Sequence, residues 1–204
     1  MKRILLLMTI LSVSVVSTAC ISNFAIKELN NKAQDYLNNG DVDSAICRLK
    51  SSLDLDSELY ETHYNLGVAY LAANNPEDAI SSFKRVIELK PDYNDAYYSL
   101  GLANTQIAFS LMDKEQTQNE DGSDYTLSAD ELQALNFHLN EAVDNYNRYL
   151  SKASNIENAD EIKSQIEMLS QQLKDRADKQ LGASNGEQEE TETEDDFETT
   201  DEDF

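Results

Sequence analysis

The most reactive side chains in this 204-residue chain belong to its two cysteines and two histidines. Cys20 and Cys47 could pair in an oxidising compartment, or Cys20 could be modified and leave Cys47 as an idle thiol. No C-x-x-C pair offers zinc ligands, and neither His63 nor His138 lies in an H-E-x-x-H motif. Glycine-rich phosphate loops and the G-x-S-x-G motif are also absent from the sequence. We therefore predict no catalytic residue, no cofactor and no metal site, and expect a chain that is not an enzyme.

One acidic stretch, from Asn119 to Asp124, has the composition of a calcium-binding loop. An EF-hand loop needs an oxygen ligand at its first position and a glutamate six residues after its glycine. Here Thr117 occupies the first position, and Ser128 follows Gly122 where the glutamate is needed. The ligand set is incomplete, so we predict a solvated turn.

The N-terminus has the order of segments found in a secretory signal peptide. Lys2 and Arg3 are followed by an apolar run over residues 4–16 and by small residues at 17–19, before Cys20. The run is shorter than the ~20 residues that a membrane-spanning helix needs. We therefore predict a signal peptide over residues 1–19 and an exported chain.

Small residues followed by cysteine resemble the lipobox of bacterial lipoproteins. The resemblance implies cleavage before Cys20, lipidation of its thiol, a short linker over residues 20–25, and a chain tethered by lipid to a membrane of the bacterial cell envelope. Ser17 departs from the pattern, because an aliphatic residue is preferred there. Plain secretion after an ordinary cleavage and an uncut anchor remain as alternatives.

The chain is strongly acidic, with a formal net charge of −23. Residues 187–203 contain many carboxylates and no lysine or arginine. A chain of this charge is repelled by phosphate backbones, which argues against nucleic-acid partners. Residues 183–204 have little apolar surface, so we predict a disordered acidic tail. An alternative function is an exported protein that buffers ions or surface charge through this tail.

Small and aromatic residues recur with a period of about 34 residues. The clearest set is Leu66, Gly67, Tyr70, Ala79, Phe83 and Pro91. One period earlier the matching residues are Ala33, Tyr36 and Ala45, and one period later they are Leu100, Gly101, Ala142 and Tyr146. Small residues allow two helices to cross closely, and the aromatic residues fill the space beside the crossing.

These offsets resemble the tetratricopeptide repeat (TPR). The resemblance implies an all-α helical solenoid with repeats at residues 26–59, 60–93 and 94–154, the third carrying an insertion at about 104–128. Asn104 stands where the third repeat should have an aromatic residue, and His63 stands at an aromatic position of the second.

Local signals place several helix ends. Asn75 followed by Pro76 predicts a helix start, and Ser128 with Glu131 has capping-box spacing before another. Apolar spacing extends the first helix of the third repeat to near Lys114. A further apolar series at Ile162, Ile166, Leu169 and Leu173 predicts a capping helix within residues 155–182, ending at Gly182.

In this family the first helix of each repeat lines a concave groove that binds peptides. By repeat position, the groove residues are Asn30, Asn31, Gln34, Tyr64, Asn65, Val68, Tyr98, Ser99 and Leu102. Some relatives hold a C-terminal carboxylate with lysine and arginine there. The matching positions here are Asn30, Gln34, Asn65, Asp95 and Ser99, none of them basic, so we reject such a clamp.

We predict a non-catalytic adaptor or scaffold that binds protein partners in the cell envelope, with Tyr64 and Tyr98 as anchors and no small-molecule substrate. Exposed tyrosines are frequent hot spots in protein interfaces. The alternative for both residues is partial packing into the helix stack.

Overall fold

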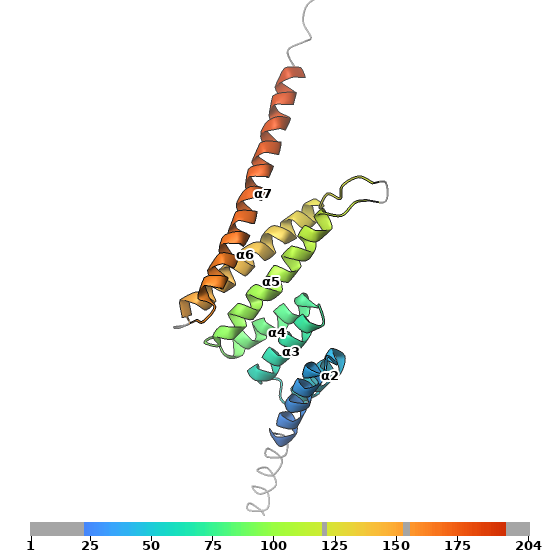
Figure 1. Cartoon of the computed structure of the whole chain (residues 1–204), viewed down its shortest axis with the longest axis vertical. Helices are drawn as coiled ribbons and strands as arrows, with labels where there is room; N and C mark the ends of the chain where they lie inside the picture. Colours follow the sequence, from blue (N-terminus) through green and yellow to red (C-terminus); the bar gives the residue numbers. More distant parts are fainter. Residues whose placement is uncertain (1–22, 120–121, 153–155, 195–204) are drawn as a thin grey trace, which may run out of the picture.

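The computed structural model describes residues 23–119, 122–152 and 156–194, with side chains described as far as Asp178. Helical residues 23–38 are followed by α2 (Val42–Leu55), α3 (Tyr60–Ala72), α4 (Pro76–Leu89), α5 (Asn94–Glu115), α6 (Ala129–Lys152) and α7 (Ala159–Glu194). Consecutive helices pack against each other as a staggered stack (Figure 1). The described residues contain no β-strand, which confirms the predicted all-α solenoid. None of the described helices is long and apolar enough to span a membrane.

The second repeat, formed by α3 and α4, shows how the repeat residues set the crossing. A Cβ added to Gly67 would lie 2.5 Å from a ring carbon of Phe83, so only glycine fits at this point. Asn74 has a φ of 56° and turns the chain between the helices. Asn75 caps α4 by accepting a hydrogen bond from the Asp78 amide at 3.3 Å, and Pro76 occupies the first helical turn.

The first repeat is formed by helical residues 23–38 and α2. Gly40, with a φ of 77°, makes the turn, and Asp41 caps α2 by accepting from the Ser44 amide at 3.2 Å. A core of small and aliphatic residues joins this repeat to α3; its buried members are Ala33, Ala45, Leu49, Leu66 and Ala69. A further cluster joins α4 to α5, with Ala79, Phe83, Leu100 and Ala103 buried in it.

The third repeat repeats the crossing but has longer helices. A Cβ on Gly101 would lie 2.5 Å from a ring carbon of Tyr146, as Gly67 meets Phe83. Helix α5 has 22 residues and ends at Glu115, close to the predicted Lys114. Helix α6 begins at Ala129 with the predicted capping box, because the Ser128 amide donates to Glu131 at 2.9 Å and the Glu131 amide donates to Ser128 at 3.3 Å.

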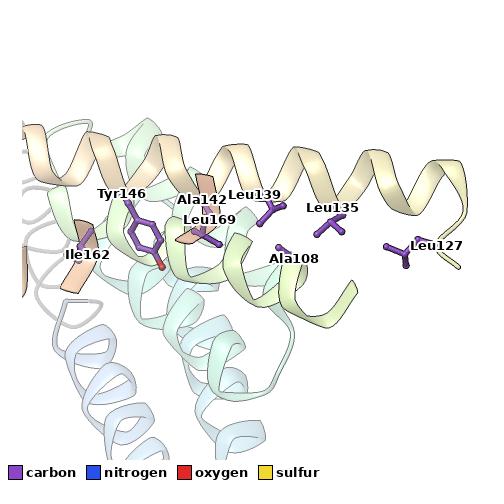
Figure 2. Close-up of a cluster of buried hydrophobic side chains, with 8 residues drawn as sticks. All are labelled: Ala108, Leu127, Leu135, Leu139, Ala142, Tyr146, Ile162 and Leu169. Carbon is purple, nitrogen blue, oxygen red and sulfur yellow. The ribbon is translucent and has the colours of Figure 1, made fainter. Parts of the chain in front are cut away.

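A continuous core runs along α5 and α6 and under α7. Figure 2 shows its buried side chains in a row between the helices: Ala108, Leu127, Leu135, Leu139, Ala142, Tyr146, Ile162 and Leu169. Leu127 belongs to the loop after α5 but is only 4% exposed, so the end of this polar loop is anchored in the core. Ile162 and Leu169 come from α7, which therefore covers the face that the third repeat leaves open.

The structure corrects the predicted end of the capping helix. Helix α7 does not stop at Gly182 but continues to Glu194, so residues 183–194 are helical rather than a disordered tail. A glycine within a helix costs only about 1 kcal/mol relative to alanine, and the glutamate and glutamine residues that follow are good helix formers. In Figure 1 the C-terminal part of α7 reaches beyond the other helices. The remainder of the predicted tail lies outside the described residues.

Candidate protein-binding face

We call the surface formed by Asn31, Gln34, Tyr64, Val68, Tyr98 and Leu102, on the first helices of the three repeats, the predicted binding face. Asn31, Gln34 and Val68 are exposed, and Val68 keeps 37% of its surface accessible. The two tyrosines and Leu102 are half-buried. The face thus combines amide, aromatic and aliphatic surface.

Tyr64 is held from three sides. Its ring centroid lies 5.6 Å from that of Phe83 and 5.1 Å from that of Tyr93, the latter edge to face. Its hydroxyl accepts a hydrogen bond from the Ser99 Oγ at 3.4 Å. One side of the ring is therefore part of the helix stack, and the exposed remainder has a fixed orientation.

Tyr98 has a similar setting in the third repeat. Its ring centroid lies 5.8 Å from that of Tyr146 and 5.3 Å from that of Tyr149. Tyr146 is fully buried and Tyr98 is half-buried at its edge. This burial raises the pKa of Tyr146 to about 12, although the Thr105 hydroxyl opposes the shift. Both predicted anchors therefore contribute to packing and to the surface at once.

The structure corrects two predicted groove residues. Ser99 is only 4% exposed, because its side chain faces the α3–α5 contact and supports Tyr64. Asn30 is half-buried, and its Nδ2 donates to Ser52 Oγ at 2.9 Å and to Thr62 Oγ1 at 3.1 Å. Such buried polar groups need partners, so Asn30 links the first repeat to the second instead of facing a ligand.

Asn65 lies beside this network and is also half-buried. Its Nδ2 donates to the Asn30 Oδ1 at 3.4 Å, a long hydrogen bond that leaves part of the amide accessible. Asn65 thus joins the polar network to the predicted binding face.

Phe109 extends the face and was missed by the sequence analysis. It lies on α5, 36% exposed, and follows Leu102 by seven residues, which is two helical turns on the same side. The sequence did contain a sign of this position, because Phe109 continues the helical spacing that places Tyr98 and Leu102 on one side. Phe109 was left out because the groove residues were assigned only from positions of the usual repeat, which ends before this point, although the helix itself was predicted to continue to near Lys114.

The histidines serve packing. His63 Nε2 lies 3.0 Å from the Ser57 carbonyl oxygen at the start of α3. His138 Nδ1 lies 2.8 Å from the Asn104 Oδ1, so Nδ1 carries the proton and donates. Burial lowers the pKa of His138 against the opposing effect of Glu77 and Glu141. Asn104, at the position predicted for an aromatic residue, is 2% exposed and polar because this histidine pairs with it.

The residues that could bind a metal or react as a thiol lie apart in the described part of the chain. No group of three or more histidine, cysteine, aspartate or glutamate side chains is arranged there to hold a metal ion. Cys47 is a free thiol, exposed on α2. Cys20 and the predicted signal peptide lie outside the described residues.

A family model for the tetratricopeptide repeat matches residues 60–93, the segment predicted as the second repeat. The first TPR of Spaghetti (RPAP3) bound to an HSP90 peptide is similar, with a TM-score of 0.53 and 22% identity over 72% of this chain and 92% of that chain. The second TPR domain of human RPAP3 in complex with an HSP70 peptide is also similar. Its TM-score is 0.54 and its sequence identity is 17%, over 72% of this chain and 98% of that chain.

The MamA protein gives a TM-score of 0.54 at 21% identity over 91% of this chain and 82% of that chain. These identities establish the fold alone. No curated protein sequence matches the chain. Together with the repeat match over residues 60–93, the similar structures show that the chain has the helical solenoid fold of tetratricopeptide-repeat domains.

Proposed function

We propose that the chain is a non-catalytic adaptor of the bacterial cell envelope whose predicted binding face holds a segment of a partner protein. The observation that carries the proposal is the exposure of Val68 and Phe109, 37% and 36%, on the first helices of the second and third repeats. Each lies on the same helix as a fixed, half-buried tyrosine. An apolar contact beside a preorganised aromatic ring is typical of protein-binding surfaces.

The similar structures support peptide binding as the mode of action. Two of them, from RPAP3 proteins, hold HSP90 and HSP70 peptides. This chain has Asn30, Gln34, Asn65, Asp95 and Ser99 at the positions that the resemblance gives to a carboxylate clamp, so its partner segment is of a different kind.

The location rests on Cys20 and the residues before it. The described helix begins by residue 23, so a lipid on Cys20 would sit within a few residues of the first repeat. The mass of the mature N-terminus from a membrane fraction tests this point. A chain that begins at a diacylglycerol-modified Cys20 supports the tether, whereas an unmodified Cys20 or a cut elsewhere removes it.

The adaptor role is tested by co-purifying partners with the full chain and identifying them by mass. Val68→Glu places a charge on the predicted binding face without altering the core, and it should abolish capture of the partner. Phe137→Glu is the matched control, since Phe137 is 52% exposed on α6 and lies outside the face. Tyr64→Ala and Tyr98→Ala are less informative, because both rings also pack against core aromatics.

The same assay separates the tail alternative. Deletion of residues 183–204 should leave the partner bound if the repeats bind it. If the deletion variant loses the partner while Val68→Glu still binds it fully, the acidic C-terminal segment is the part that binds.

A further inference from the structure

Five half-buried tyrosines gather at the predicted binding face, to which Tyr64 and Tyr98 belong. We call them the tyrosine cluster: Tyr60, Tyr64, Tyr93, Tyr98 and Tyr149. The ring centroid of Tyr93 lies 5.3 Å from that of Tyr60 and 5.1 Å from that of Tyr64. The centroid of Tyr98 lies 5.3 Å from that of Tyr149. The hydrogen bond from Ser99, the residue after Tyr98, to the Tyr64 hydroxyl joins the two groups.

The surroundings of the tyrosine cluster are acidic. Burial, followed by the neighbouring Tyr64 and the carboxylates of Asp95 and Glu61, raises the pKa of Tyr93 to about 12. Asp95 also adds to the effect of burial in raising the pKa of Tyr149. Asp95 and Glu61 are both exposed, and Glu61 also lies near Lys90, whose pKa its charge helps to raise after the hydrogen bond to Tyr60. A cation at this place would meet both aromatic faces and carboxylates.

The chain already places one ammonium group on the tyrosine cluster, since Lys90 Nζ lies 5.6 Å from the ring centroid of Tyr93 and closer still to Tyr60. Lys90 Nζ lies 4.1 Å from the ring centroid of Tyr60 and donates to its hydroxyl at 2.8 Å. Lys152 Nζ lies 4.2 Å from the ring centroid of Tyr97. Within the described residues, no lysine or arginine is stacked on Tyr64 or Tyr98. The rings nearest the predicted binding face are therefore left without an internal cation.

We propose that the tyrosine cluster, with Asp95 and Glu61, takes a lysine or arginine side chain of the bound segment, so that the partner protein presents a basic segment. This inference rests on the proposed adaptor function. Aromatic faces attract ammonium and guanidinium groups within about 6 Å, more strongly where water is partly excluded. The net charge of −23 further favours encounter with a basic partner. By contrast, the RPAP3 neighbours hold peptides that end in Glu-Glu-Val-Asp.

The experiment uses three fluorescein-labelled peptides of equal length, with alternating alanine and lysine, acetyl-lysine or glutamate. Anisotropy titrations of the full chain should show binding of the lysine peptide at least about tenfold tighter than that of the other two. Asp95→Asn combined with Glu61→Gln should weaken the lysine peptide about fivefold, and Tyr98→Leu about tenfold. The acetyl-lysine peptide keeps the aliphatic stem of lysine but lacks its positive charge, so the difference from the lysine peptide measures the contribution of that charge.

Matched variants separate local recognition from general attraction to an acidic chain. Asp144→Asn removes one exposed charge from α6, and Phe137→Leu removes one exposed aromatic ring outside the cluster; both should leave the affinity unchanged. The Asp95 and Glu61 variants change exposed residues, so they test the inference even if Tyr98→Leu disturbs the fold.

The inference is overturned if the glutamate peptide binds as tightly as the lysine peptide, if the Asp95 and Glu61 variants bind the lysine peptide as the parent does, or if no peptide binds. If the glutamate peptide binds the parent chain but not Val68→Glu, the adaptor function is supported and only the proposal of a basic partner is wrong. Failure of the co-purification test would instead remove the adaptor function itself.

Discussion

The second and third repeats share one crossing but differ greatly in length. A Cβ on Gly67 or Gly101 would meet Phe83 or Tyr146 at 2.5 Å, so the same close approach occurs in both. Yet α3 and α4 have 13 and 14 residues, whereas α5 and α6 have 22 and 24. Glycine and the facing ring therefore set how the helices cross, and other residues set where they end.

Turn residues explain the difference in length. In the second repeat, Asn74 adopts a φ of 56° and Asn75 caps the next helix. In the third repeat the chain continues through Gln106 to Phe109 without such residues, and α5 extends for more than two further turns. The added turns of α5 and α6 have their own buried contacts, from Ala108 and Leu135 among others, which make them a stable arm of the fold.

The largest effect is expected in this arm. Leu135 is fully buried, so Leu135→Ala should lower the free energy of unfolding by about 3 kcal/mol through lost burial and a cavity. Urea unfolding followed by circular dichroism measures this change. Phe137→Ala, two residues away and 52% exposed, should change it by less than about 0.5 kcal/mol. Equal effects of the two substitutions would show that the arm is not part of the cooperative unit.

The shared crossing is tested by Gly67→Ala and Gly101→Ala. Each added methyl group overlaps a buried ring, and each variant should lose about 2 kcal/mol by the same unfolding measurement. Gly40→Ala is the control, since its Cβ meets nothing within 4 Å and only the φ of 77° is unfavourable, at about 1 kcal/mol. A normal stability for Gly101→Ala alone would break the equivalence of the two repeats.

Helix starts should contribute equally in the two repeats. Asn75→Ala and Ser128→Ala each remove a side-chain acceptor at a helix N-terminus, and each should lower the free energy of unfolding by about 1 kcal/mol. Ser128→Asp keeps an acceptor and should restore most of the loss. If Ser128→Ala has no effect, the start of α6 is fixed by the buried Leu127 alone.

The smallest effect concerns the polar pair that is present only in the third repeat. The lowered pKa of His138 means that the folded state binds fewer protons than the unfolded state near pH 6, so stability is present above pH ~6.5 and falls on acidification. The drop in urea midpoint between pH 7.5 and 5.5 should be larger in the parent than in His138→Gln. Equal drops in the two proteins would assign the pH dependence to other groups.

Short-range patterns carried most of the correct predictions. Asn75 with Pro76, and Ser128 with Glu131, fix helix starts through contacts within three residues, and the sequence shows these spacings directly. The repeat period placed Gly67 at the helix crossing and Phe83 beside it, and the structure adds that the two face each other directly. The core positions of the fold follow from the same periodicity.

Long-range polar contacts were not predictable. Asn30 meets Ser52 and Thr62, and Asn104 meets His138, through side chains more than 20 residues apart at positions where the repeat pattern specifies no polar residue. For this reason Asn30 and Ser99 were assigned to a surface that they support from within. The extension of α7 past Gly182 was missed because a glycine stop signal was given more weight than the helix-forming residues after it.

Site-specific photo-cross-linking tests the proposed binding face most directly. Benzoylphenylalanine at Val68 of the full chain, irradiated in the source cells, should give one or a few discrete cross-linked proteins, while the same group at Phe137 should give none of them. If Val68 gives no cross-link, or if both positions give the same products, the predicted binding face is not where this protein binds its partners.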